Sequence, residues 1–307
     1  MMEKQQKINY VSWALVLGYA KYHKDFIESC KVLGNEQKFS MPLTNPKTNK
    51  VAHKVKLRGV IDKIVKVGNS IWVIDHKSTS RMPNRDVLAL SSQGDIYLDY
   101  VSQKYGNLKG VIWDYIKKPS IKQKQKETIE EYFERLKLDV ESRPEFYFEQ
   151  FQIKRYKSDL DESKLDIWQT NKLLLVCKNN DLYPKYTNSC QSFWACDYLP
   201  ICNNGFDEEV DGFEVVKRNN DERLESFSSL KCFRECPRRY KLRYIDGIRC
   251  TKKSEALITG SAIHFGLELL YSDDDLDKGI ELVNSHYSKL NNEIIKPIKK
   301  EKENEDF

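Results

Sequence analysis

A two-residue turn signal, Gly68-Asn69, limits the possible folds of this chain more than any other feature. Strand-like sequence lies on both sides of it, at residues 51–67 and 71–76, so the pattern predicts a β-hairpin. Counted from the turn, Asp62 and Asp75 lie nearly opposite each other on the two strands. The sequence therefore predicts a pair of neighbouring carboxylates.

Two carboxylates this close repel each other unless a hard cation such as Mg²⁺ or Mn²⁺ neutralises them. Lys77 follows two residues after Asp75, so strand alternation directs both side chains to one face. A metal there polarises a phosphate and activates water, while the ammonium stabilises developing charge. Alone, Asp-x-Lys is more often an exposed ion pair. Gly59-x-x-Asp62 before it and a helix after it favour phosphodiester hydrolysis.

The helix expected after the hairpin, over residues 85–105, adds two polar side chains. Gln93 and Tyr97 are four residues apart, so they lie one above the other on the same face. Glutamine can orient a water or a phosphate oxygen, and tyrosine offers a hydroxyl and a ring for stacking. Taken alone, such a pair is more often surface packing.

The composition is that of an ordinary globular protein, with 40% hydrophobic and 32% charged residues. Its 307 residues allow one large domain or two smaller ones. No apolar run approaches the roughly 18 to 20 residues that a bilayer span requires, and the polar start lacks the apolar core of a secretory signal. We therefore expect a cytoplasmic protein with no membrane partner.

Basic clusters and cysteines add weaker signals. Two basic clusters could face phosphates: Lys117, Lys118, Lys122, Lys124 and Lys126, and Arg238, Arg239, Lys241 and Arg243. Such runs are usually a solvated surface. The net charge of only +5 adds little support for a nucleic-acid partner. Eight cysteines in an intracellular chain favour metal ligation or buried thiols over disulfides. Cys30, Cys177 and Cys250 stand alone and are read as small buried hydrophobes.

The combination of Gly-x-x-Asp, Asp-x-Lys and Gln-x-x-x-Tyr resembles the motif set of the PD-(D/E)XK nucleases of the RecB type. This group includes the nuclease domains of RecB and AddB, iron–sulfur exonucleases of CRISPR loci and many phage exonucleases. The resemblance implies an α/β fold, with a central mixed β-sheet flanked by helices as in restriction endonucleases. It also implies a metal-dependent DNA nuclease, in particular an exonuclease, acting in recombination or end processing in a bacterial or phage-infected cell. Its partners would be single-stranded or duplex DNA ends and a helicase or recombination protein.

The resemblance also implies roles for single residues. The metal ligands would be Asp62, Asp75, the backbone carbonyl of His76 and the ring of His264. This histidine ends Gly260-x-x-x-His264, the counterpart of the family's Gly-x-x-His element. Lys77 would be the catalytic lysine, supported by Gln93 and Tyr97. Without this context, His264 would be read as a core histidine.

Four cysteines match those that hold a [4Fe–4S] cluster in the iron–sulfur members: Cys236, within Cys-Pro-x-x-Tyr, and the later set Cys190, Cys196 and Cys202. The resemblance thus implies a cluster that staples distant segments together. Zinc is the main alternative. Zinc sites usually show a Cys-x₂₋₄-Cys pair, which is absent here apart from Cys232 and Cys236, so iron–sulfur is favoured.

The order of the motifs departs from the family pattern. Relatives carry Cys-Pro-x-x-Tyr and Gly-x-x-His before the hairpin, whereas here both follow it. The chain is a natural circular permutant, a fusion of parts of two nucleases, or the product of a circular genome opened within the gene. A permutant requires His264 to approach Asp62 and Asp75, and Cys236 to approach the other three cysteines.

This order predicts four regions. Residues 1–205 would form the nuclease core with the catalytic hairpin and the late cysteines, and residues 206–221 a linker. Residues 222–295 would be a helical segment carrying the Cys-Pro-x-x-Tyr and Gly-x-x-His elements, followed by a disordered tail over residues 296–307.

Overall fold

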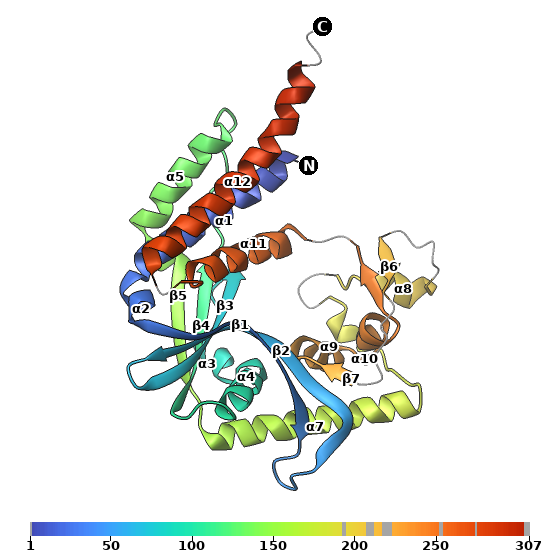
Figure 1. Ribbon diagram of the computed structural model, residues 1–307. Coiled ribbons are helices and arrows are strands. Elements are labelled where there is room, and N and C mark those ends of the chain that lie inside the picture. The colour runs from blue at the N-terminus through green and yellow to red at the C-terminus, as the bar shows by residue number, and fades with distance from the viewer. Residues whose placement is uncertain are drawn as a thin grey trace.

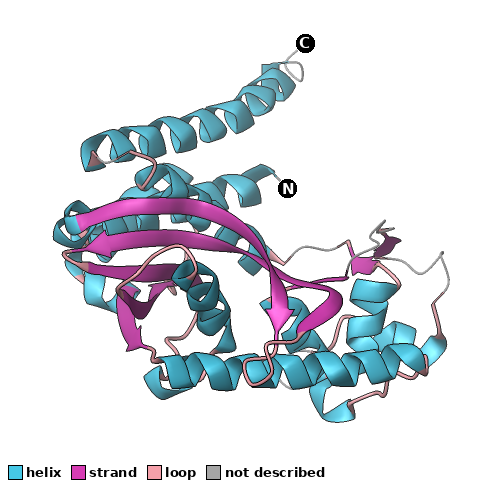
Figure 2. Ribbon diagram, turned by 60° about the horizontal axis from the view of Figure 1, so that its bottom comes forward, coloured by secondary structure: helices cyan, strands magenta, loops and turns pink. Residues whose placement is uncertain are grey.

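The computed structural model describes residues 2–191, 195–206, 212–216, 223–251, 254–273 and 275–303, without the side chains of residues 2 and 292–303. Helices cover both faces of a β-sheet (Figures 1 and 2). The strands are β1 (Cys30–Thr44), β2 (Val51–Val67), β3 (Ser70–Thr79), β4 (Leu108–Lys117), β5 (Phe148–Lys154), β6 (Phe213–Val215), β7 (Arg223–Glu225) and β8 (Ile248–Cys250). The α-helices are α1 (Met2–Tyr22), α2 (Lys24–Ser29), α3 (Arg85–Ala89), α4 (Ser92–Ser102), α5 (Ile129–Ser142), α6 (Pro144–Tyr147), α7 (Lys157–Asn179), α8 (Leu199–Asn204), α9 (Phe227–Glu235), α10 (Pro237–Tyr240), α11 (Glu255–Leu270) and α12 (Leu276–Glu303).

The main sheet is mixed, as the α/β expectation requires. Its order is β1-β2-β3-β4-β5, with β7 beside β2. The pairs β3–β4 and β2–β7 are parallel, and the other neighbours are antiparallel. The parallel step from β3 to β4 is made through α3 and α4, a helical crossover that places α4 against the sheet beside β3. The fold class expected from the sequence is confirmed.

Several boundaries differ from the sequence-based expectation. The helix expected over residues 85–105 is divided into α3 and α4, and Asn84 caps the first piece by accepting the backbone N–H of Asp86. Residues 145–156 alternate in hydrophobicity as a strand does, yet the strand begins only at Phe148. Pro144 starts the short helix α6 instead, because the fixed φ of proline suits the first turn of a helix.

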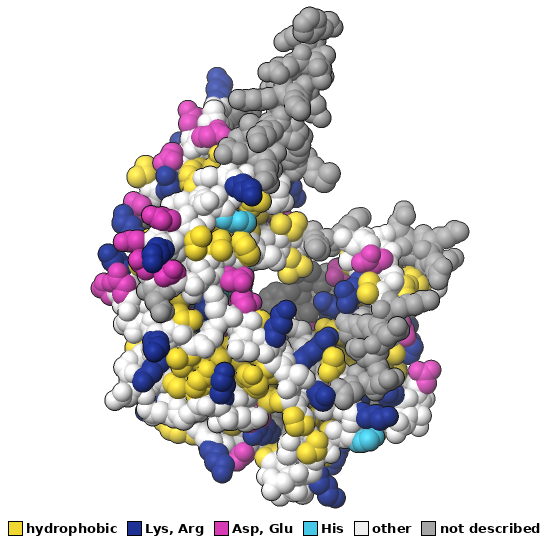
Figure 3. Space-filling model, in the orientation of Figure 1, with side chains coloured by type: hydrophobic (Ala, Val, Ile, Leu, Met, Phe, Trp, Pro, Cys, Tyr) yellow, Lys and Arg dark blue, Asp and Glu magenta, His cyan; other side chains and the backbone are white. Residues whose placement is uncertain are grey.

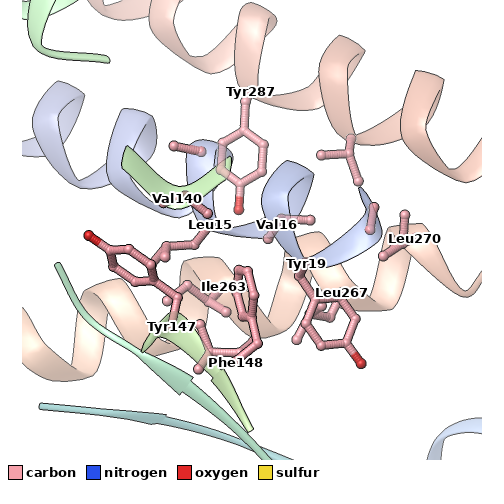
Figure 4. Packing of buried hydrophobic residues seen from close by; sticks show 14 of the residues in the cluster. Leu15, Val16, Tyr19, Val140, Tyr147, Phe148, Ile263, Leu267, Leu270 and Tyr287 are labelled. Atoms are coloured by element: carbon pink, nitrogen blue, oxygen red, sulfur yellow. The ribbon is translucent and has the colours of Figure 1, made fainter. Parts of the chain in front are cut away.

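A large core lies between one face of the sheet and the helices α1, α5, α11 and α12. Its central side chains, shown in Figure 4, are Leu15, Val16, Tyr19, Val140, Tyr147, Phe148, Ile263, Leu267, Leu270 and Tyr287. The helices approach closely at Gly266, where an added Cβ would lie 2.7 Å from Val16. A second core lies on the opposite face, under α4 and α7.

The first and last described helices lie side by side (Figure 1). The amide of Asn9 donates to Asn291 Oδ1 at 3.3 Å, and Trp13 Nε1 donates to Asn284 Oδ1 at 2.9 Å. A later residue of α1 thus contacts an earlier residue of α12, so the two helices run antiparallel. The start of α1 therefore lies beside the part of α12 near Leu290. A circular permutant needs these two places to be close, because a relative with the usual order connects them directly.

The expected linker and tail fall partly outside the described residues. Of residues 206–221, the structure describes only 206 and 212–216, and these include β6, which pairs with β8. Helix α12 continues to Glu303, beyond residue 296, where a disordered tail is expected. In the part of the chain that the structure describes, no helix is long and apolar enough to cross a bilayer.

Candidate active site

The β2–β3 hairpin brings the two carboxylates of the sequence motif together. Its register pairs Lys63 with Ile74, and one further step sets Asp62 across from Asp75. The backbone N–H of His76 donates to Asp62 Oδ2 at 2.8 Å. Asp75 is only 1% exposed, so its carboxylate is removed from bulk water.

Lys77 lies on the same face as Asp75, as strand alternation predicts. Its Nζ is 2.7 Å from Asp75 Oδ2, and its side chain keeps 35% exposure. Burial raises the pKa of Asp75 to about 6; Lys77 opposes this rise, and Asp62 adds to it. The site therefore concentrates negative charge beside one partly accessible ammonium group.

Helix α4 supplies a hydrogen bond to this carboxylate. Gln93 Nε2 donates to Asp75 Oδ1 at 3.1 Å and to the Tyr97 hydroxyl at 2.8 Å. Burial raises the pKa of Tyr97, so its hydroxyl stays protonated near neutral pH. The helix reaches the sheet this closely because Gly94 has no Cβ, which would lie 2.8 Å from Val111. Gln93 and Tyr97 thus position Asp75.

Helix α11 brings the distant histidine to the same place. His264 Nδ1 lies 3.6 Å from Asp62 Oδ2, and the ring centroids of His264 and His76 are 6.3 Å apart. Burial lowers the pKa of His264, against the effect of Asp62, and favours the neutral imidazole that a metal ligand requires. The histidine and the hairpin meet within one chain despite their reversed order in the sequence.

A buried polar network lies behind the hairpin and was not predicted from the sequence. His76 Nδ1 is 2.9 Å from Asp114 Oδ2, on the neighbouring strand β4, and the Tyr19 hydroxyl donates to the same oxygen. The hydroxyl oxygens of Tyr19 and Tyr271 are 3.1 Å apart. The available signal was a single aspartate within the apolar strand Val111–Ile116.

Lys63 is a second missed residue, next to Asp62 on β2. Its side chain is fully buried, and its Nζ lies 5.4 Å from the Tyr271 ring centre. Burial lowers the pKa of Lys63, whereas the nearby acids Asp62, Glu36 and Glu268 oppose this change. Lys63 therefore places a buried amine next to the acidic site from inside the protein.

The donors suit a hard cation in their chemistry. Carboxylate oxygens, a backbone carbonyl and a neutral imidazole are ligands that Mg²⁺ and Mn²⁺ accept. Among the described residues, however, no group of three or more His, Cys, Asp or Glu side chains is placed to hold a metal ion. Lys77 pairs with Asp75, and the His76 backbone pairs with Asp62. Metal binding would therefore require the Lys77 ammonium to move away from Asp75, while the His76 N–H can continue to hold Asp62.

The structure places the four cysteines of the motif in one region. The backbone N–H of Cys196 donates to the carbonyl of Cys190 at 2.9 Å. Burial raises the pKa of Cys202, and the thiols of Cys196 and Cys236 add to this effect. All four thiols are free, and within the described part of the chain no set of side chains that includes them is placed to hold a metal ion. The expected staple is therefore not seen, although its residues lie near one another.

Tyr240, the last residue of Cys-Pro-x-x-Tyr, ties this region to the main sheet. Its hydroxyl donates to Glu225 Oε1 at 2.6 Å, and Glu225 also accepts the Ser229 hydroxyl. Glu225 is buried on β7, where it pairs with Leu57 of β2. The cysteine region is thereby joined to the strand that carries Asp62.

A family model described as the PD-(D/E)XK nuclease superfamily matches residues 12–203 and 225–303. The chain belongs to this superfamily. The two matched stretches contain, respectively, the β2–β3 hairpin and His264, so the PD-(D/E)XK resemblance seen in the motifs is confirmed at the level of the superfamily. No curated protein and no solved structure matches the chain.

Proposed function

We propose that this PD-(D/E)XK protein is a metal-dependent DNA nuclease that acts as an exonuclease in recombination or DNA end processing. The observation that carries the proposal is the convergence of Asp62, Asp75, Lys77, Gln93, Tyr97 and His264 from the hairpin, α4 and α11. On the face in Figure 3, Lys and Arg side chains also gather beside a hollow between α11, β2 and α9, as a polyanionic substrate requires.

The ligands for Mg²⁺ or Mn²⁺ would be Asp62, Asp75, the His76 carbonyl and His264. When bound, such a metal supplies a Lewis acid for the phosphate and makes water a better nucleophile at neutral pH. The His76 backbone holds Asp62 by its N–H, and Gln93 holds Asp75. Both carboxylates are thus oriented before the substrate arrives.

Lys77 is the proposed catalytic lysine. Its ammonium is partly exposed and lies 2.7 Å from Asp75, so a small rotation brings it from the carboxylate to a phosphate oxygen. There it stabilises the negative charge that develops as the phosphodiester bond breaks. His76 and Asp114 anchor the strand between Asp75 and Lys77 from the opposite face.

The proposal is tested with end-labelled single-stranded and duplex DNA. We expect products that shorten from an end in Mg²⁺ or Mn²⁺, and no products in EDTA, because the carboxylates need the cation. A closed circular DNA of the same sequence is the matched control, since an exonuclease leaves it intact. Cutting that continues in EDTA would overturn the metal role, and cutting of the circle would overturn exonuclease action.

We also propose that Cys190, Cys196, Cys202 and Cys236 hold a [4Fe–4S] cluster, with zinc as the alternative. The support is their family pattern and their nearness to one another, with Cys236 at the start of α10. Thiolates are soft ligands that suit iron–sulfur clusters and zinc alike. A cluster would connect the late cysteines to α10 across a long stretch of sequence.

Protein purified without oxygen is expected to be brown, with about four iron atoms and four sulfides per chain. Changing any of the four cysteines to Ser should bleach it and lower its melting temperature, because the cluster holds distant segments. Cys30→Ser is the control and should keep the colour, since Cys30 lies outside this region. A colourless protein with one zinc per chain would replace the cluster by a zinc staple.

Two further parts of the proposal rest on the family resemblance alone. One is a helicase or recombination protein as partner, and the other is action in the cytoplasm of a bacterial or phage-infected cell. Co-purification of the tagged protein from such cells tests both.

A further inference from the structure

We infer that a lysine-lined groove next to the catalytic hairpin binds a short single-stranded stretch of DNA adjoining the bond that is cut. The inference deepens the proposed nuclease function and rests on it. The groove lies where α11 passes the ends of β3 and β4, beside α1 (Figure 1).

The groove begins where the candidate active site ends. Ser78, directly after Lys77, faces α11 at Gly260, where an added Cβ would lie 2.9 Å from the serine hydroxyl. Gly260 is one helical turn before His264. Further along the same two elements, Ser80 and Ala256 line a cavity of about 410 Å³. The cavity therefore begins three residues after Lys77 along the chain and two helical turns before His264 on α11.

Lysines from two separate elements line this cavity. Lys7 comes from α1, whereas Lys118 and Lys122 come from the loop after β4, which the sequence marks as a basic cluster. Lys118 Nζ donates to the carbonyl of Ala256 at 2.8 Å, which ties the loop to α11. The other two ammonium groups, those of Lys7 and Lys122, suit the regularly spaced phosphates of a nucleic acid.

A second cavity of about 610 Å³ continues the groove, since Lys7 and Glu255 line both. It adds Lys4 and the acid Glu3. Lys4 Nζ lies 3.0 Å from Glu255 Oε2, so one of the two acids along the groove already has a cationic partner. With four lysines and two glutamates, the groove has a net positive charge.

The size and lining of the groove favour an unpaired strand over a duplex. A cavity of about 410 Å³ is in the range of sites for small molecules, which spans roughly 300–1,000 Å³, and it holds about one or two nucleotides. Ile8, Val11 and Ile121 provide an apolar wall that bases can contact once they are unstacked. A duplex keeps its bases stacked inside and would present only its outer phosphates.

The test measures binding of a fluorescent single-stranded oligonucleotide in EDTA, where no cutting occurs. We expect the Lys7→Gln, Lys122→Gln double variant to bind several-fold more weakly. The slope of its log affinity against log salt concentration should be shallower than that of the wild type by about 1.4, which is about 0.7 for each lost phosphate contact. Lys118 is left unchanged because it also holds α11. Lys172→Gln, an exposed position on α7, is the control and should bind as the wild type does.

Three outcomes decide the inference, provided that the melting temperatures of the variants match the wild type. Unchanged affinity and slope in the double variant would overturn it. An equal loss of affinity for fluorescent poly-glutamate would also overturn it, by showing a general anion site. An equal loss for blunt duplex would refute the preference for an unpaired strand. Because binding is measured without metal, these results do not depend on whether the wild type cuts DNA.

Discussion

Lys77→Ala and Asp75→Ala should each reduce DNA cleavage below detection, a loss of at least about 10²–10³-fold, while DNA binding stays largely intact. The reason is the geometry of the site: the Lys77 ammonium and the Asp75 carboxylate are 2.7 Å apart and belong to one charged unit. Removing the second member after the first should therefore add little. The measurement is the rate of release of labelled nucleotides under single-turnover conditions.

Lys66→Ala provides a matched control for the lysine variant. Lys66 lies on the same hairpin but is exposed, so its removal should leave the rate within about twofold of the wild type if only local charge matters. Full cleavage by Lys77→Ala would contradict the role of Lys77. Failure of the Asp75 variant to bind DNA would show that its effect is structural and not catalytic.

His264→Ala is expected to raise the Mg²⁺ concentration needed for half-maximal cleavage by about 10- to 100-fold or more, because a ligand of the metal is lost. His264 reaches the hairpin from the other end of the chain, 3.6 Å from Asp62. The measurement is a metal titration of the cleavage rate, with Mn²⁺ as a second metal. His53→Ala, at an exposed position of β2, is the control.

A mixing experiment decides whether this histidine acts within its own molecule. The mixture is assayed at a Mg²⁺ concentration too low for the His264→Ala protein to cut DNA. If each site forms within one chain, equal amounts of the Asp75→Ala and His264→Ala proteins should then show no more activity than either alone. Recovery of about a quarter to a half of the wild-type activity would mean that two chains exchange their segments, as in domain swapping. That result would contradict the single-chain site that a permutant requires.

The local part of the site could be predicted from the sequence because a short turn determines the register of a hairpin. Counting from Gly68-Asn69 placed Asp62 opposite Asp75, and the structure has the same register. Alternation likewise predicted that Lys77 and Asp75 share a face. Both conclusions depend only on residues within one pair of adjacent strands.

The network behind the hairpin could not be predicted in this way. Asp114 reaches His76 only because β4 pairs in parallel with β3, and parallel pairing across a helical crossover leaves no turn from which to count. Tyr19 and Tyr271 approach it from the two ends of the chain. Their positions follow from the packing of α1 and α11, which periodicity in the sequence does not specify.

The position of His264 was expected from the family resemblance, and not from local pattern. A lone histidine on an amphipathic helix carries no information about which strand it faces. The local sequence likewise does not show what Tyr240 contacts. Its buried partner Glu225 lies on a three-residue strand too short to be recognised in the sequence. Long-range contacts of this kind decide how the site is completed.

The antiparallel contact of α1 with α12 has a consequence for how the protein is made. The hairpin residues leave the ribosome early, whereas His264 and the partners of α1, Asn284 and Asn291, follow some 200 residues later. Because synthesis proceeds at roughly 5–20 residues per second, the histidine is added about 10 to 40 s after the carboxylates. Until His264 and helix α11 have been made, the hairpin carboxylates lack this partner, so the proposed nuclease site stays incomplete while the chain between them is synthesised.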